Sequence, residues 1–330
     1  MSEITEEDIT KSVSGDENIP LVSIWCTVYN HEPYLRQCLD GFVMQKTNFK
    51  FEAIVHDDAS TDGSAAIIRE YAEKYPDIIK PILETENQYS KKDGSLQNII
   101  DAQVLGKYIA ICEGDDYWID PNKLQMQVDF LEANPDYGMC YTKTSVYKQN
   151  RQKITGVFGR AFNGFEELIQ GNVIPTLTVM LRSDFEWKYK AEVKPSEKNW
   201  LMGDYPRWLW MSLNTKIKFI KHITSVYRVL ENSASHSPDI EKQVVFLKSA
   251  YDIQKYFVDT YRPDITLPDF DEHKYRGYFY LFRNQRQKAA EEYMQVAEKT
   301  NKIKLLAFIC RNCILFRILK LYYSVRGGNI

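Results

Sequence analysis

Three segments in the first half of the chain pair an apolar run with an amphipathic stretch. The runs "LVSIWCTVYN" from 21, "FEAIVHDD" from 51 and "GKYIAICEGDD" from 106 are apolar and rich in β-branched residues, as expected of buried strands. Apolar residues at helical spacing follow each run, and we expect the buried stripes to be Leu35, Leu39, Phe42 and Val43, then Ile67, Ile68, Tyr71 and Ala72, then Leu124, Val128 and Leu131. Ser60 or Thr61 is the expected N-cap of the second helix. The alternation predicts an α/β fold with a mostly parallel central sheet and helices on both faces.

Polar residues stand where each of these predicted strands ends. Asn30, the pair Asp57-Asp58 and the pair Asp115-Asp116 should meet at one edge, because ligands lie at the carboxyl ends of parallel strands. Adjacent carboxylates repel unless a cation lies between them, and Mg²⁺ or Mn²⁺ suits carboxylate and phosphate oxygens. Neither a G-x-G-x-x-G nor a G-x-x-x-x-G-K-[ST] motif is present. The sequence therefore predicts a metal-assisted site for a nucleotide or other phosphate ligand.

Four motifs carry a resemblance to a known family. "VSIWCTVYN", "IVHDDASTDGS", "GKYIAICEGDD" and "GDYPRWLW", in this order, resemble the family 2 glycosyltransferases of GT-A fold, the metal-dependent inverting enzymes of capsule, O-antigen and cell-wall assembly. The resemblance covers residues 20–235. It implies transfer of a single sugar from a nucleotide-diphospho-sugar, expected to be a UDP-sugar, to a glycan or polyprenyl-linked acceptor in surface polysaccharide biosynthesis.

The resemblance also implies roles for individual residues. Asp204 matches the catalytic base, and Asp116 the principal ligand of Mn²⁺ or Mg²⁺. The residues implied at the nucleotide are Thr27, Tyr29, Asp58, Asn98 and Asp115, with Asp115 also near the metal. Weaker candidates are Arg228 at the diphosphate and His236 at the metal. Where family members often have Arg-Asn, this chain has Gln97-Asn98, so diphosphate contact is expected to shift to Lys91 or Lys92.

Each of these residues also has a purely structural explanation. Asp204 could cap a helix, Tyr29 could pack on the sheet edge, and His236 could be a solvated loop residue. The aromatic residues of "RWLW" could be core side chains or an apolar wall under the acceptor sugar. The familiar Asp-Asp-Gly-Ser is here Asp57-Asp58-Ala59-Ser60, which removes backbone freedom at one turn position.

Two other functional classes compete with the transferase. A sugar-nucleotide nucleotidyltransferase would share the doubly wound fold but needs a Gly-rich basic loop after the first strand, which "TVYNHEPY" does not offer. A non-catalytic sugar-binding or scaffold protein could keep the same fold. The four aspartates at positions 58, 115, 116 and 204 favour the enzyme.

The two ends of the chain differ in charge from its middle. Residues 1–19 form an expected acidic, disordered tail, and 236–330 an expected helical region. Residues 301–330 hold six bases, no acid and many apolar side chains, which predicts peripheral contact with a membrane; the alternative is a helix docked on the catalytic domain.

Composition narrows the setting. The formal net charge of −3 gives no indication of nucleic-acid binding. No signal peptide or apolar run long enough for a membrane span is visible, and the six cysteines are scattered, four of them in apolar segments. We therefore expect a cytoplasmic protein, peripheral on the inner face of the cell membrane.

Overall fold

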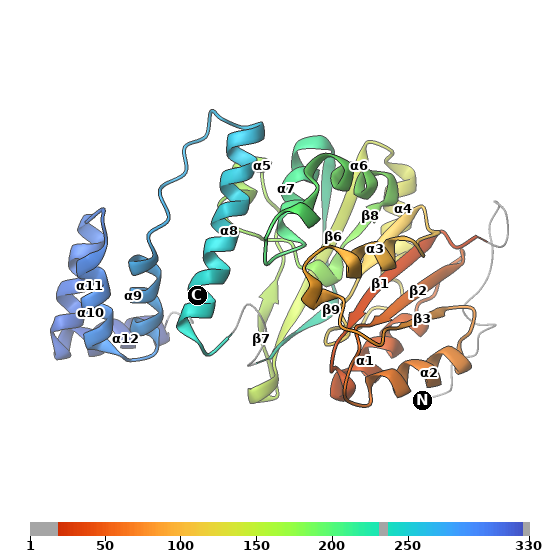
Figure 1. The fold of residues 1–330 in the computed structure, drawn as a ribbon, viewed down its shortest axis with the longest axis horizontal. Coiled ribbons are helices and arrows are strands. Elements are labelled where there is room, and N and C mark those ends of the chain that lie inside the picture. The colour runs from red at the N-terminus through yellow and green to blue at the C-terminus, as the bar shows by residue number, and fades with distance from the viewer. Residues whose placement is uncertain (1–18, 231–236, 326–330) are drawn as a thin grey trace. The chain divides into compact units, whose positions relative to one another are not determined.

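The computed structural model describes residues 19–230 and 237–325 (Figure 1). It divides into two compact units, one up to Leu230 and one from Glu231 onward. The expected acidic tail lies outside the described residues except for Ile19, and so do His236 and the expected domain boundary at 235.

One sheet forms the centre of the first unit. Its nine strands within the described residues are β1 (Val22–Val28), β2 (Phe51–Asp57), β3 (Ile79–Leu83), β4 (Tyr108–Ile111), β5 (Tyr117–Trp118), β6 (Tyr137–Lys148), β7 (Lys153–Phe158), β8 (Met180–Arg182) and β9 (Lys216–Val229). The spatial order is β3-β2-β1-β4-β8-β6-β9-β5, with β7 on the side of β6. The first four positions pair in parallel, which confirms the predicted parallel half; β8 then joins β4 and β6 in antiparallel fashion.

Helices cover both faces of this sheet, as predicted. They are α1 (Glu32–Val43), α2 (Ser64–Lys74), α3 (Ser95–Asp101), α4 (Lys123–Ala133), α5 (Phe165–Leu168), α6 (Ser183–Val193) and α7 (Tyr205–Asn214). The predicted stripes of α1, α2 and α4 join one core with alternate residues of β1, although Ala72 is only half-buried. Trp25 points to the opposite face, where Arg207 of α7 lies 5.5 Å from its ring centre.

The register of β1 and β2 brings the polar strand ends together. Val28 pairs with Asp57, and the Asp58 amide donates to the Val28 carbonyl at 2.9 Å. The Gly114 amide, just beyond β4, donates to the Thr27 carbonyl at 3.0 Å. The predicted edge therefore carries both acidic motifs.

The N-cap predicted for α2 is wrong. The helix begins at Ser64, and its N-cap is Gly63. The loop before it is hydrogen-bonded to the start of α1. Asp62 accepts from the amides of Ser64 and Glu32, and Glu32 accepts from the Gly63 amide. Side chains from one helix start thus satisfy the free N–H groups of the other, which the local sequence could not show.

The second unit is helical, as predicted. It contains α8 (Ile240–Tyr261), α9 (Glu272–Phe282), α10 (Arg286–Gln295), α11 (Asn301–Arg311) and α12 (Cys313–Val325). A small core including Leu281, Tyr293, Ile303 and Phe316 joins α9 to α12. Within the described part of the chain, no helix is long and apolar enough to cross a membrane.

Candidate active site

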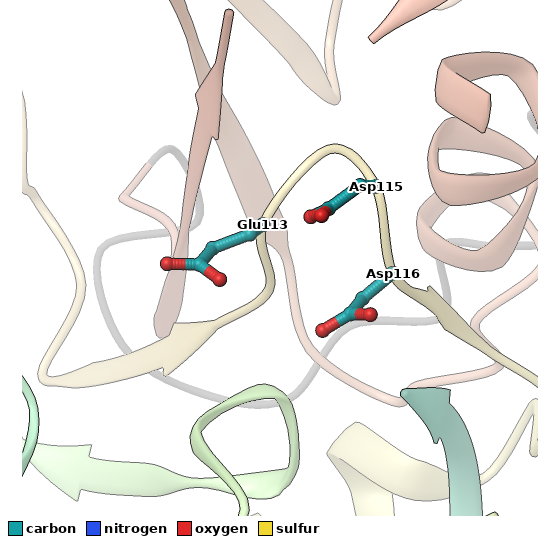
Figure 2. Close-up of side chains that lie close together, drawn as sticks. All are labelled: Glu113, Asp115 and Asp116. Carbon is teal, nitrogen blue, oxygen red and sulfur yellow. The ribbon is translucent and has the colours of Figure 1, made fainter. Parts of the chain in front are cut away.

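Three carboxylates gather in the turn that joins β4 to β5. Figure 2 shows Glu113, Asp115 and Asp116 on this turn, and one oxygen from each lies within 4.8 Å of the others. Gly114 permits the tight approach, because a Cβ there would come within 2.8 Å of Nδ1 of His31 and 2.9 Å of Cγ2 of Val28. The strand end and the glycine together place three negative charges in one small space.

Arg228, near the end of β9, holds this turn in place. Its backbone N–H donates to Oδ1 of Asp116 at 2.7 Å, and its Nε donates to the Asp115 carbonyl at 2.7 Å. The remaining guanidinium nitrogens donate to Gln37 at 2.8 Å and Gln149 at 3.2 Å. The guanidinium of Arg228 also lies over the rings of Tyr34 and Tyr117, 4.8 and 5.1 Å from their centres, so Arg228 connects the acidic turn with the residues around it.

The environment of Asp116 disfavours a bare negative charge. The residue is 3% exposed, and burial, followed by the charge on Asp115, raises the pKa of Asp116 well above its usual range. Burial against protein atoms and the charges on Asp115 and Asp204 also raise the pKa of Glu113 to about 8. A divalent cation would remove the repulsion, and an all-carboxylate donor set fits Mn²⁺ or Mg²⁺.

Asp204 lies close enough to interact electrostatically with Glu113 of this cluster. It caps α7, and its Oδ1 accepts from the Tyr205 amide at 2.7 Å. Its Oδ2 accepts from Oγ1 of Thr176 at 2.7 Å and from Nδ2 of Asn172 at 3.4 Å. The charge of Asp204 contributes to the raised pKa of Glu113, so the capping residue also belongs to the site.

The residues expected around the nucleobase divide into two groups. Tyr29 is 49% exposed, so its ring is not packed into the core, and Thr27 beside it is half-buried. Asp58 is buried, and its two oxygens accept from the amides of Gln88 at 2.5 Å and Tyr89 at 3.1 Å. In this structure the Asp58 carboxylate fixes the loop after β3.

The structure does not join the other predicted residues to the carboxylates. Asn98 is exposed on α3, and Lys91 donates to Oε1 of Gln88 at 2.9 Å from the short 3-10 helix Tyr89–Lys91. Lys92 is exposed and has left-handed backbone geometry. Among the residues that the structure describes, no hydrogen bond or ion pair connects Asn98, Lys91 or Lys92 with Glu113, Asp115 or Asp116. Their predicted roles stay predictions.

Some residues of the site were not predicted. His31 is a partly exposed residue whose Nδ1 is buried without a hydrogen-bond partner, and burial lowers the pKa of His31 while Asp115 opposes that shift. Thr176 and Asn172 reach Asp204 from a segment without periodic pattern, so no sequence signal could have found them. The tryptophans of "RWLW" are core side chains, because Trp208 and Trp210 are 0% and 2% exposed.

Comparisons with known proteins agree with this geometry. Residues 23–186 match the family model described as Glycosyl transferase family 2. An uncharacterized protein of Mycobacterium tuberculosis is 38% identical over 164 residues, which cover 49% of this chain and 46% of that protein. The chain thus spans about half the length of its mycobacterial relatives.

Two further proteins resemble a larger share of the chain. The UDP-Glc:alpha-D-GlcNAc-diphosphoundecaprenol beta-1,3-glucosyltransferase WfgD of Escherichia coli is 26% identical over 249 residues, covering 72% of this chain and 87% of that enzyme. The mannosyltransferase PcManGT of Pyrobaculum calidifontis has the same fold, with a TM-score of 0.53 at 16% identity over 92% of this chain and 88% of that one. Motifs, sheet topology and family match agree: residues 23–186 form a domain of the Glycosyl transferase family 2 type, built on the GT-A fold.

Proposed function

We propose that this glycosyltransferase moves one sugar from a UDP-sugar to a glycan or polyprenyl-linked acceptor, with inversion at the anomeric carbon, in surface polysaccharide synthesis. The observation that carries the proposal is the buried Asp116, crowded by Asp115 and by Glu113, which is itself within electrostatic reach of Asp204. The name of the Escherichia coli relative gives a UDP-sugar donor and a polyprenyl diphosphate acceptor. The solved mannosyltransferase is in complex with GDP-Man and Mn²⁺, so the identity of the nucleobase in the donor is the first point to test.

Asp115 and Asp116 would hold Mn²⁺ or Mg²⁺. Bound there, the ion would offset the charge that develops on the departing diphosphate. The Arg228 backbone N–H already occupies Oδ1 of Asp116, which orients that carboxylate. Tyr29 is exposed and could stack on the nucleobase, and Asp58 stabilises the loop at 88–89 beside it.

Asp204 would accept the proton of the acceptor hydroxyl. The acceptor oxygen bonds to the anomeric carbon while the bond from that carbon to the diphosphate oxygen breaks, and its electron pair leaves with the diphosphate. This single displacement inverts the anomeric centre. Thr176, Asn172 and the Tyr205 amide fix the Asp204 carboxylate; two of these donors occupy Oδ2, and Oδ1, which accepts one hydrogen bond, keeps a lone pair for the proton.

Nucleotide binding tests the proposal without knowledge of the acceptor. We expect UDP with Mn²⁺ to raise the melting temperature of the wild type more than GDP, CDP or dTDP does. At about 100 times Kd the stabilisation is about 2.7 kcal/mol, or roughly 5–10 °C for a folding unit of about 150–250 residues, the size range of the first unit.

Two variants at the site separate metal binding from proton transfer. Asp116→Asn should lose the UDP-dependent shift, whereas Asp204→Asn, which carries the same chemical change at the base, should retain it. If GDP gave the larger shift the donor would be a GDP-sugar, and if no nucleotide shifted the wild type the enzymatic proposal would fail.

A further inference from the structure

Apolar side chains are exposed on the last two helices of the described chain. On α12, Ile314 and Ile318 are one helical turn apart and 70% and 57% exposed. On α11, Leu305 and Phe308 are 56% and 59% exposed. The opposite stripe of α11, with Ile303, Leu306 and Cys310, is buried in the small core of the unit. Both helices are therefore packed by one set of apolar residues and leave a second set in contact with solvent.

The charged residues of α11 and α12 are all bases. Lys304 precedes Leu305, and Arg317 lies between Ile314 and Ile318, one position before the latter; both bases are exposed. The sequence from 301 to 330 contains six bases and no acid. A protein partner of mixed charge does not require such an excess, whereas an anionic lipid surface attracts bases and accepts apolar side chains at the same depth.

We propose that the exposed residues of α11 and α12, defined here as Leu305, Phe308, Ile314 and Ile318 with Lys304 and Arg317, bind the surface of an anionic lipid bilayer. The apolar side chains enter the boundary between headgroups and acyl chains, and the two bases lie at the headgroup phosphates. Since no helix of the described residues spans a bilayer, this contact is peripheral and reversible.

Vesicle flotation with the full chain tests this proposal. The probes are vesicles of phosphatidylcholine alone and vesicles containing about one-third phosphatidylglycerol, a share chosen to give a surface potential like that of anionic membranes. We expect the wild type to float with the anionic vesicles, to bind the neutral ones much less, and to lose binding as salt is raised. The assay contains no sugar nucleotide, so its result is independent of the transferase proposal.

Two sets of substitutions locate the contact. Phe308→Ser with Ile314→Ser and Ile318→Ser should abolish flotation, and Lys304→Gln with Arg317→Gln should weaken it about fivefold for each base removed. The matched control is Ile154→Ser with Val157→Ser on β7, since these residues are 59% and 52% exposed but lie in the first unit. A melting curve for each variant confirms that it folds, and the charge variant keeps the test valid if the apolar one does not.

Three results would overturn the proposal. The first is a wild type that stays with the unbound fraction, and the second is equal flotation of the wild type and both variants. The third is a wild-type dimer, seen by sedimentation, that the apolar substitutions dissociate; the exposed apolar residues would then cover a second copy of the chain.

Discussion

At the scale of single residues, two positions carry a cost that the surrounding fold imposes. Ala59 occupies the left-handed region at φ 60°, which favours glycine. Lys123 is fully buried, with its Nζ 4.0 Å from the ring centre of Trp118 and 2.8 Å from Oε1 of Gln127. Both positions lie close in sequence to the site, which is where such costs are usually tolerated.

Ala59→Gly should stabilise the protein. The left-handed conformation destabilises an L-residue by about 1–2 kcal/mol, and glycine removes this strain. Glycine also gives the unfolded chain more conformational entropy, which offsets part of the gain. We expect a net gain of about 1 kcal/mol in the free energy of unfolding, measured by urea denaturation. The control Ala66→Gly, on the exposed face of α2, should lose about 1 kcal/mol. A loss at both positions would show that the strain at Ala59 is not real.

Lys123 should make stability depend on pH. Burial lowers the pKa of Lys123 to about 7 from its usual 10.5. Between these values the unfolded chain binds one proton more than the folded one, so the stability of the wild type rises with pH, by at most about 1.4 kcal/mol per unit. Lys123→Met removes the group and hence this slope.

Denaturation of both proteins at pH 7, 8 and 9 measures the effect. As pH rises, the free energy of unfolding of the wild type should increase relative to that of Lys123→Met. The other titrating groups are the same in both proteins, so their effects cancel in this difference. Lys221→Met, at an exposed lysine, should run parallel to the wild type. Parallel curves for Lys123→Met as well would mean that Lys123 keeps an ordinary pKa when folded.

At the scale of elements, a buried ion pair connects α7, the helix that Asp204 caps, to the neighbouring helix α6. Glu186 of α6 accepts from Nε of Arg207 at 2.6 Å, and both side chains are almost fully buried. Arg207 comes three residues after Asp204 on α7. The ion pair between Glu186 and Arg207 therefore fixes the position of α7, the helix that the Asp204 carboxylate caps.

Glu186→Ala should destabilise the protein strongly, because it leaves the Arg207 guanidinium buried without its partner. A loss of about 3–5 kcal/mol is expected. The control is Asp184→Ala on the same helix, where the exposed pair with Lys188 should contribute only about 0.3–0.5 kcal/mol. Thermal denaturation compares the two, and equal small losses would show that Arg207 finds other partners.

The elements that the sequence predicted are those with local signals. The strands β1, β2 and β4 and the helices α1, α2 and α4 each have a periodic apolar pattern and polar residues at their ends. The sequence does not predict the long strands β6 and β9, because each derives its stability from a partner far away along the chain: Tyr147 of β6 pairs with Arg228 of β9, and Tyr117 of β5 pairs with Val226 of β9. The contacts of Arg228 with the acidic turn at Asp115 and Asp116 depend on that pairing and could not be foreseen.

At the scale of the whole molecule, the candidate site and the proposed lipid contact belong to different units. The site draws on residues from Thr27 to Arg228, all in the first unit, whereas the exposed residues of α11 and α12 belong to the second. Substitutions without shared partners usually act independently. Changes at Ile314 and Ile318 should therefore leave metal and nucleotide binding intact.

If Asp115 and Asp116 hold the cation that holds the diphosphate, the protein should bind Mn²⁺ through these two side chains. Electron paramagnetic resonance measures it directly, because Mn²⁺ loses its sharp free-ion signal when bound. In the presence of UDP, we expect the wild type and Ile314→Ser/Ile318→Ser to bind one Mn²⁺ with equal affinity and Asp116→Asn to bind at least about tenfold more weakly, a loss of about 1.4 kcal/mol or more. Equal Mn²⁺ binding by the wild type and Asp116→Asn would contradict the account.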